Sequence, residues 1–293
     1  MEISPANSTP ARIASWKSGA VAKRAASLKS AASPSFTAPL PLALWHLTSL
    51  DAPTVAVVWA LAFAWTARIS LPLWLPLLLA LVAWAVYIAD RLLDARSAHQ
   101  THRLHRIRLR HHFHWRHRQI FFPIAVASTC AATILVFTFM PIGALQPNTV
   151  LAAAALAYFS GVHIPRRLIP FPRRNISATS LKEPIVAILF TAACVLPTLS
   201  RTPHQSALEL WPLTIPAFFF TLLAWLNCHA IEHWESAGGP SYPTVFVHAV
   251  SLAVIGQLLS FALTAFRPRS AALIAAGAAS AFFLALLDRQ RTR

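Results

Sequence analysis

The chain reads LPLWLPLLLALVAWAVYIADRLLD over residues 71–94. The apolar run from Leu71 to Ala89 approaches the roughly 20 residues that a helix needs to cross a bilayer, and it is followed by two carboxylates, Asp90 and Asp94. Over the 293 residues, 56% are hydrophobic and 12% are charged, which is typical of a membrane protein. Because lipid offers the backbone no hydrogen-bonding partner, such runs are expected to be helices. The sequence therefore predicts an all-α, polytopic transmembrane helix bundle.

Seven further apolar stretches resemble the first. We expect about eight spans, over residues 53–69, 71–89, 119–142, 148–164, 184–200, 210–231, 242–266 and 270–287. Residues 1–45 are basic and rich in Ser, Ala and Pro, which predicts a disordered tail. An organelle transit peptide has a similar composition and stays an alternative. Residues 46–293 are expected to form one transmembrane domain.

The basic residues favour one orientation of these spans. With the N-terminus inside, 21 of the 25 Lys and Arg residues fall in inner segments, and the outer ones are Arg68, Arg201, Arg267 and Arg269. Lys and Arg accumulate in cytoplasmic loops, so both termini are expected on the cytoplasmic side of the cell membrane. The net charge of +16 is clustered between apolar spans. This clustering indicates lipid head groups or phosphates as partners, and no nucleic acid.

Four of the nine acidic residues form two tight pairs. Asp90 and Asp94 follow the second span, and Glu232 and Glu235 follow the sixth, so the span count places both pairs on the cytoplasmic side. Spacings of four and three put each pair on one helix face. Carboxylates near hydrocarbon are costly and mark functional sites, and Mg²⁺ takes oxygen ligands that phosphate and water complete. All four are predicted to be Mg²⁺ ligands and catalytic residues; a salt-bridged helix end is the alternative for either pair alone.

Cationic side chains in the inner loops could hold the phosphates of a ligand. Arginines recur at helical spacing in the loop after the second span, and a basic pair follows the fourth span. Guanidinium groups bind phosphate through paired hydrogen bonds, although the same charges could simply fix the topology. We add one amide that is expected to be buried in the sixth span. The predicted substrate-binding residues are Arg103, Arg106, Arg110, Arg166, Arg167, Lys182 and Asn227.

The histidine-rich loop offers a weaker alternative. Zinc could be bound by four histidines of this loop, which are His111, His112, His114 and His117. Zinc sites built from histidine usually include a Cys or carboxylate ligand as well. No such residue stands beside these four in the sequence, so zinc is not the preferred prediction.

The paired acids give the chain a resemblance to the UbiA superfamily of intramembrane prenyltransferases. Those proteins are helical, with about nine spans, and hold a polyprenyl diphosphate through Mg²⁺ on acid-rich motifs after the second and sixth helices. The first family motif is Asn-x-x-x-Asp-x-x-x-Asp. Asp90 and Asp94 match its acids, while Val86 stands at the Asn position. Glu232 and Glu235 stand where the second motif usually has aspartates.

The loops extend this resemblance. The basic loop 95–118 is similar in position to the loop that follows the first family motif. Arg166 and Arg167 fit a basic pair after the fourth helix, and Val162 stands where the family tends to carry a Tyr. The similarity in order and spacing covers residues 50–235.

The resemblance implies a membrane transferase that moves a prenyl group from a polyprenyl diphosphate to a hydrophobic acceptor, either aromatic or lipid-like. Mg²⁺ would neutralise the departing diphosphate, and Trp225 or Trp234 could stabilise an allylic cation. A transporter or channel is an alternative, because intramembrane acids also serve ion pathways. A catalytically inactive family member is another. A cytidine-diphosphate alcohol transferase is disfavoured, since its long Asp- and Gly-containing pattern is absent.

Overall fold

A computed structural model of the chain describes residues 40–100, 109–163, 178–202, 207–235 and 244–291. The chain divides into two units, residues 1–43 and 44–293, and nearly all described residues belong to the second. Every regular element in the described ranges is an α-helix. The prediction of an all-α helix bundle is therefore confirmed.

Most helices of the described residues correspond to the predicted spans. The helices are α2 (Leu40–Leu47), α3 (Asp51–Thr66), α4 (Trp74–Gln100), α5 (Leu109–Arg116), α6 (Arg118–Phe139), α7 (Ile142–His163), α8 (Ala178–Leu199), α9 (Ala207–Glu235), α10 (Thr244–Thr264) and α11 (Pro268–Arg291). Each predicted span falls on one of them, whereas the short helices α2 and α5 lie outside the predicted spans.

Seven of these helices, α4 and α6 to α11, are long and apolar enough to cross a membrane. The predicted first span is shorter than expected. Helix α3 is apolar but has 16 residues, and at 1.5 Å per residue it reaches about 24 Å, less than the roughly 30 Å of a hydrocarbon core. The chain is thus a multi-pass membrane protein. Its helix α3 is apolar but shorter than the seven helices that can cross a membrane.

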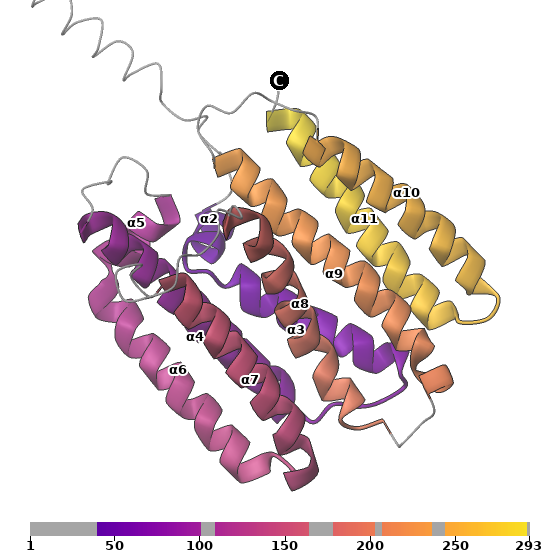
Figure 1. Cartoon of the computed structure of the whole chain (residues 1–293), viewed down its shortest axis with the longest axis horizontal. Helices are drawn as coiled ribbons and strands as arrows, with labels where there is room; N and C mark the ends of the chain where they lie inside the picture. The colour runs from indigo at the N-terminus through magenta and orange to yellow at the C-terminus, as the bar shows by residue number, and fades with distance from the viewer. Residues whose placement is uncertain (1–39, 101–108, 164–177, 203–206, 236–243, 292–293) are drawn as a thin grey trace, which may run out of the picture. The chain divides into compact units, whose positions relative to one another are not determined.

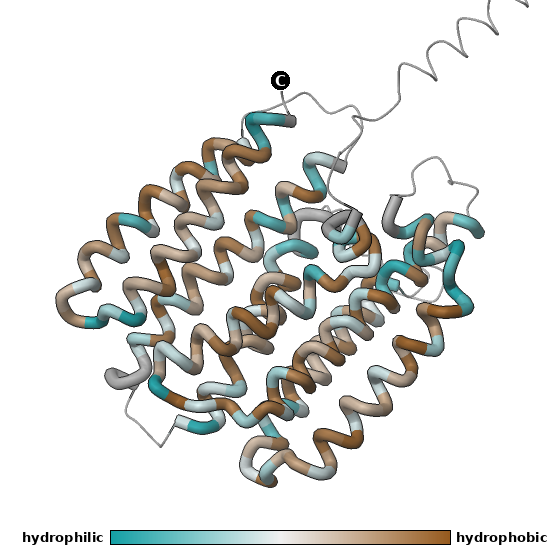
Figure 2. Tube along the Cα trace, turned by 180° about the vertical axis from the view of Figure 1, so that it is seen from behind, coloured by the Kyte–Doolittle hydropathy of each residue, from teal (hydrophilic) through white to brown (hydrophobic). Residues whose placement is uncertain are grey.

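Helix α3 packs against several other helices of the bundle. It lies against α4 and α8 and also meets α9 and α11. The hairpin of α10 and α11 lies on one side of α9, and α6 lies along the opposite edge against α4 (Figure 1). Hydrophobic residues run along the helices, while hydrophilic residues gather near helix ends, as beside α5 (Figure 2). Large apolar side chains that remain exposed, such as Phe137, Ile142 and Phe261, fit a lipid-facing surface.

Glycines allow close packing between α9 and the α10–α11 hairpin. The ring of Phe219 on α9 is 4% exposed. A Cβ built at Gly256 on α10 would lie 2.5 Å from Cζ of Phe219, and one at Gly277 on α11 would lie 2.8 Å from its Cε1. Real Cβ atoms do not approach rings so closely. Small residues at helix interfaces commonly permit such close approach in membrane bundles.

This packing predicts that Gly256→Ala destabilises the protein. The intrinsic helix preference for Ala over Gly would favour the substitution by about 1 kcal/mol, but overpacking against Phe219 should cost about 1–3 kcal/mol. Gly161→Ala on α7 is the matched control, since a Cβ there meets no atom within 4 Å. Thermal unfolding of the purified protein in detergent should show a lower melting temperature for Gly256→Ala than for Gly161→Ala. Equal melting temperatures would contradict the packing.

Candidate functional site

One end of the bundle collects polar side chains from five helices. Three side-chain contacts join α4 to α7, α8 to α9, and α9 to α11; they are Asp90 with His163, Glu183 with His229, and Trp234 with Asp288. The side chain of Lys182, the neighbour of Glu183, lies within electrostatic range of Asp90. Both acidic motifs therefore lie at the same end of the bundle (Figure 1).

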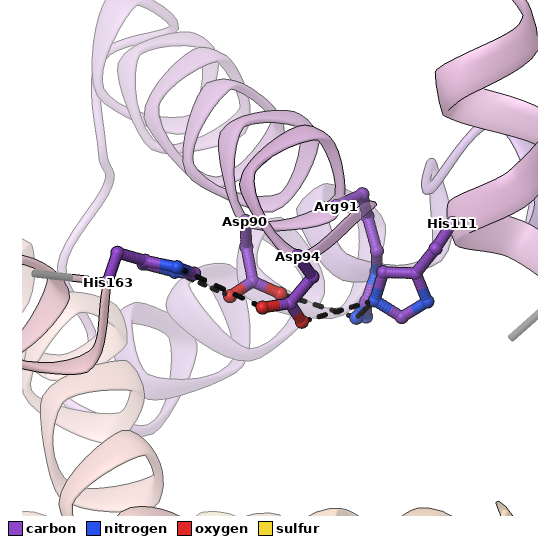
Figure 3. A network of polar contacts seen from close by, with 5 residues as sticks. All are labelled: Asp90, Arg91, Asp94, His111 and His163. Atoms are coloured by element: carbon purple, nitrogen blue, oxygen red, sulfur yellow. Dashed lines mark hydrogen bonds and ion pairs between the residues drawn. The ribbon is translucent and has the colours of Figure 1, made fainter. Parts of the chain in front are cut away.

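The pair of carboxylates on α4 lies between two histidines (Figure 3). Asp90 and Asp94 are one turn apart, within the helix rather than beyond its end. On one side, His163 of α7 places Nε2 3.3 Å from Oδ1 of Asp90 and Nδ1 3.9 Å from Oδ1 of Asp94. On the other side, Nε2 of His111 from α5 lies 3.4 Å from Oδ2 of Asp94. Three helices thus contribute to one polar cluster.

A buried arginine completes this cluster. Arg91 is 7% exposed, and its NH1 lies 3.3 Å from Oδ2 of Asp90 and 3.1 Å from Nε2 of His111. Its guanidinium also lies 5.7 Å from the centre of the Tyr87 ring. A buried charge is tolerated when it is paired and hydrogen-bonded. The carboxylate of Asp90 therefore has its compensating positive charge on the next residue of the same helix.

Tyr158 on α7 places a hydroxyl group near the same cluster. The hydroxyl of Tyr158 is buried and has no hydrogen-bond partner within the described ranges. It lies within electrostatic range of Asp90, of Asp94 and of Cys228 on α9. Buried polar groups normally find partners. This hydroxyl can therefore donate to a ligand that binds near the carboxylates.

A second polar pair lies on α8 and α9. Nδ1 of His229 is 3.1 Å from Oε2 of Glu183. The ring of Trp225 stacks on His229 with 5.6 Å between ring centres, and it also lies 5.9 Å from the ring of His248 on α10. Trp225 is thus packed against imidazole rings at the same end of the bundle as the α4 carboxylates.

Of the second acidic motif, Glu232 does not belong to the group of metal-binding side chains on α4 and α5. Among the described residues, the group of metal-binding side chains whose ligand atoms lie within 4.8 Å of one another is Asp90, Asp94 and His111. Glu232 is exposed on α9 and is not in this group. Glu235 ends α9, and its side chain lies outside the described residues. A site shared by all four carboxylates therefore stays a prediction.

Of the cationic residues predicted to bind phosphate, Lys182 has a described side chain and the arginines do not. Lys182 is exposed on α8 and acts on Asp90 over a longer range, which fits a phosphate-binding role. Arg110 lies in α5, but its side chain is outside the described residues. The other predicted arginines lie wholly outside them, at Arg103, Arg106, Arg166 and Arg167.

Asn227 differs from its prediction, because its side chain is exposed and not buried. The neighbours Leu226 and Ala230 are 1% and 0% exposed, so they define the buried face of α9. Asn227 lies about 100° away from Leu226 around a helix of 3.6 residues per turn. The expectation that it is buried against a neighbouring helix was wrong, while a role toward a ligand stays a prediction.

The four loop histidines do not converge on one point in the described structure. His111 faces the carboxylates, whereas the ring of His114 packs on Phe121 at 4.3 Å between centres. Nδ1 of His117 lies 2.9 Å from the carbonyl oxygen of Phe113, and His112 is exposed. The described geometry therefore supports His111 as a partner of the carboxylates and not as one of four zinc-binding histidines.

Comparisons with known proteins found no similar protein. No family model matches the chain, and neither does any curated protein or solved structure.

The contact between Trp234 and Asp288 predicts a stability effect. Nε1 of Trp234 donates to Oδ1 of Asp288 at 2.7 Å, and Asp288 is 3% exposed. Trp234→Phe keeps the aromatic ring but removes a donor from a buried carboxylate, which should lower the free energy of unfolding by about 1–3 kcal/mol. Trp45→Phe, at a tryptophan that is 43% exposed, is the control. A chemical unfolding series in detergent should separate the two variants; equal stability would show that this hydrogen bond contributes little.

Proposed function

We propose that the protein is an integral membrane transferase that moves a prenyl group from a polyprenyl diphosphate to a hydrophobic acceptor, aromatic or lipid-like. The observation that carries the proposal is the carboxylate pair of Asp90 and Asp94, set among cationic and hydrogen-bonding groups at one end of an apolar bundle. A lipid with a charged diphosphate head would need both an apolar environment and a charged site. Its chain needs an apolar surround, and its head needs metal and positive charge.

The carboxylates fit the Mg²⁺ that the proposal expects. Asp90 and Asp94 present oxygens within 4.8 Å of each other, and Mg²⁺ is commonly held by one or two carboxylates together with waters and substrate phosphates. Such an ion would supply charge neutralisation for the diphosphate as it leaves. Glu232 and Glu235 remain proposed ligands and catalytic residues of the second motif.

The residues of the chain would divide the remaining work. His163 contacts both aspartates and so holds their orientation. Arg91 and Lys182 add positive charge near Asp90, and Tyr158 offers its hydroxyl. In the reaction, the bond between the prenyl carbon and the diphosphate oxygen breaks, a bond to the acceptor forms, and the acceptor loses a proton. Positioned opposite charge lowers the barrier because it stabilises charge that develops in the transition state.

The direct test is to incubate the purified protein with labelled prenyl diphosphates of several lengths and candidate acceptors, with Mg²⁺, with Mn²⁺ or with a chelator. We expect metal-dependent transfer of label to one acceptor class. Asp90→Asn removes a metal ligand while keeping the side-chain shape, and it should lower turnover at least 100-fold, since removing a key electrostatic group costs about that much.

Asp51→Asn is the matched control for this test. Asp51 pairs with His46 at 3.0 Å and is not a member of the α4 cluster, so its variant should retain turnover within about twofold of the wild type. Full activity in Asp90→Asn would refute the assignment of the site. Failure of the wild-type protein to bind any prenyl diphosphate would refute the proposed function as a whole.

A proton or cation pathway is the second candidate, and one observation favours it. Asp and His side chains from α4, α5 and α7 contact one another within an apolar bundle, and such chains of titratable groups also serve as proton relays. The protein reconstituted in vesicles with a pH-sensitive dye would distinguish the two. The proposed transferase predicts no proton or cation flux above that of empty vesicles, whereas flux abolished by Asp90→Asn would favour transport.

A further inference from the structure

Two side-chain atoms contact the guanidinium of Arg91, and an oxygen of Asp94 lies beside one of them. Oδ2 of Asp90 and Nε2 of His111 lie 3.3 Å and 3.1 Å from NH1, and Oδ2 of Asp94 lies 3.4 Å from the same nitrogen of His111. Arg91 and His111 lie together on one side of the carboxylates, and His163 lies on the other (Figure 3). His111 is 4% exposed, so its ring is held in place by the fold.

Nε2 of His111 has two neighbours that call for opposite hydrogen-bonding roles. A guanidinium can only donate, so Nε2 would accept from Nη1 of Arg91, whereas a carboxylate can only accept, so Nε2 would have to donate to Oδ2 of Asp94. Nε2 therefore lies between a cation and a carboxylate oxygen. Electron-rich atoms gathered in this way favour a cation nearby, and Nη1 of Arg91 supplies one beside Asp90 and His111.

We propose that Asp90, Asp94 and His111 form a binding site for a divalent transition-metal ion of the Zn²⁺ class, and that the guanidinium of Arg91 fills the ion's position when no metal is bound. Two carboxylates and one imidazole make three protein ligands. Catalytic zinc sites keep three protein ligands and leave a further position for water or substrate. His163 then acts as a positioning residue that hydrogen-bonds to the carboxylate of Asp90, as outer partners do in metal sites.

The imidazole of His111 changes the preferred ion from the Mg²⁺ that fits the two carboxylates alone to one of the Zn²⁺ class. Mg²⁺ prefers oxygen ligands, whereas imidazole suits Zn²⁺, Fe²⁺ and related ions. A mixed nitrogen and oxygen site binds Zn²⁺ more tightly than Mn²⁺. The inference rests on the proposed function only for what the metal is used for, because the binding is tested without any prenyl diphosphate.

The test is a calorimetric titration of the full-length protein in detergent with Zn²⁺ and, separately, with Mg²⁺. His111→Ala should weaken Zn²⁺ binding at least tenfold, since even outer-shell partners change affinity by about 10–100-fold, while Mg²⁺ affinity changes less than threefold. His112→Ala is the matched control, because this neighbour is exposed and should leave both affinities unchanged. Asp94→Asn should weaken the binding of both ions.

Removing Arg91 tests the second part of the proposal. Arg91→Gln removes the competing positive charge and should tighten Zn²⁺ binding at least tenfold. Arg91→Lys keeps a positive charge, on an ammonium group instead of a guanidinium, and should tighten Zn²⁺ binding less. The lysine variant also serves if the glutamine variant does not fold. Weaker Zn²⁺ binding in a folded Arg91 variant would overturn the idea that the guanidinium occupies the ion's place.

The outcomes separate this inference from the proposed function. Equal Zn²⁺ affinity in wild type and His111→Ala, or an equal loss in His112→Ala, would overturn the metal site, because binding would then come from other histidines of the chain. Zn²⁺ binding that depends on His111, in a protein that binds no prenyl diphosphate, would keep the site and refute the transferase.

Discussion

The ion pair of Asp90 and Arg91 is the interaction on which the polar end of the bundle depends. The side chain of Asp90 is 29% exposed and that of Arg91 is 9% exposed, in a helix whose other residues are largely apolar. A carboxylate in such a place must be compensated. One adjacent guanidinium cannot satisfy two aspartates one turn apart, so the fold brings His111 and His163 to them from two other helices.

The same contacts hold helices that have little core packing of their own. Helix α7 has no buried residue within Ile142–His163, and its backbone packs mainly against α8. In the described part of the chain, the side chain of His163 joins α7 to α4. The short α5 contacts α4 through His111 and also through the stacking of Trp115 on His99. The cluster that could bind a ligand is therefore also what positions two of its own elements, so ligand binding and the placement of α5 and α7 should be coupled.

Hydropathy was sufficient to predict the long apolar helices, though not the short α2 and α5, and helical spacing was sufficient to predict the carboxylate pair on α4. The contacts between helices were not predictable, because Arg91 meets His111 across 20 residues and Asp90 meets His163 across 73. His163 belongs to no sequence motif, although a histidine at the end of an apolar span is itself a signal of a polar site. Tyr158 lies one turn before Val162, the position at which the resemblance expects a tyrosine. Asn227 was misplaced because the buried face of α9 follows Leu226 and Ala230, and composition alone does not reveal that phase.

The most direct test of the central claim is electron–nuclear double resonance on the wild-type protein with Mn²⁺ as a paramagnetic ion and a prenyl diphosphate present. If the α4 carboxylates and His111 hold a metal that also contacts the diphosphate, the spectrum contains coupling to one imidazole nitrogen and to phosphorus. The nitrogen coupling disappears in His111→Ala. A Mn²⁺ signal with neither coupling, or with phosphorus coupling that persists unchanged in Asp90→Asn, would contradict the account.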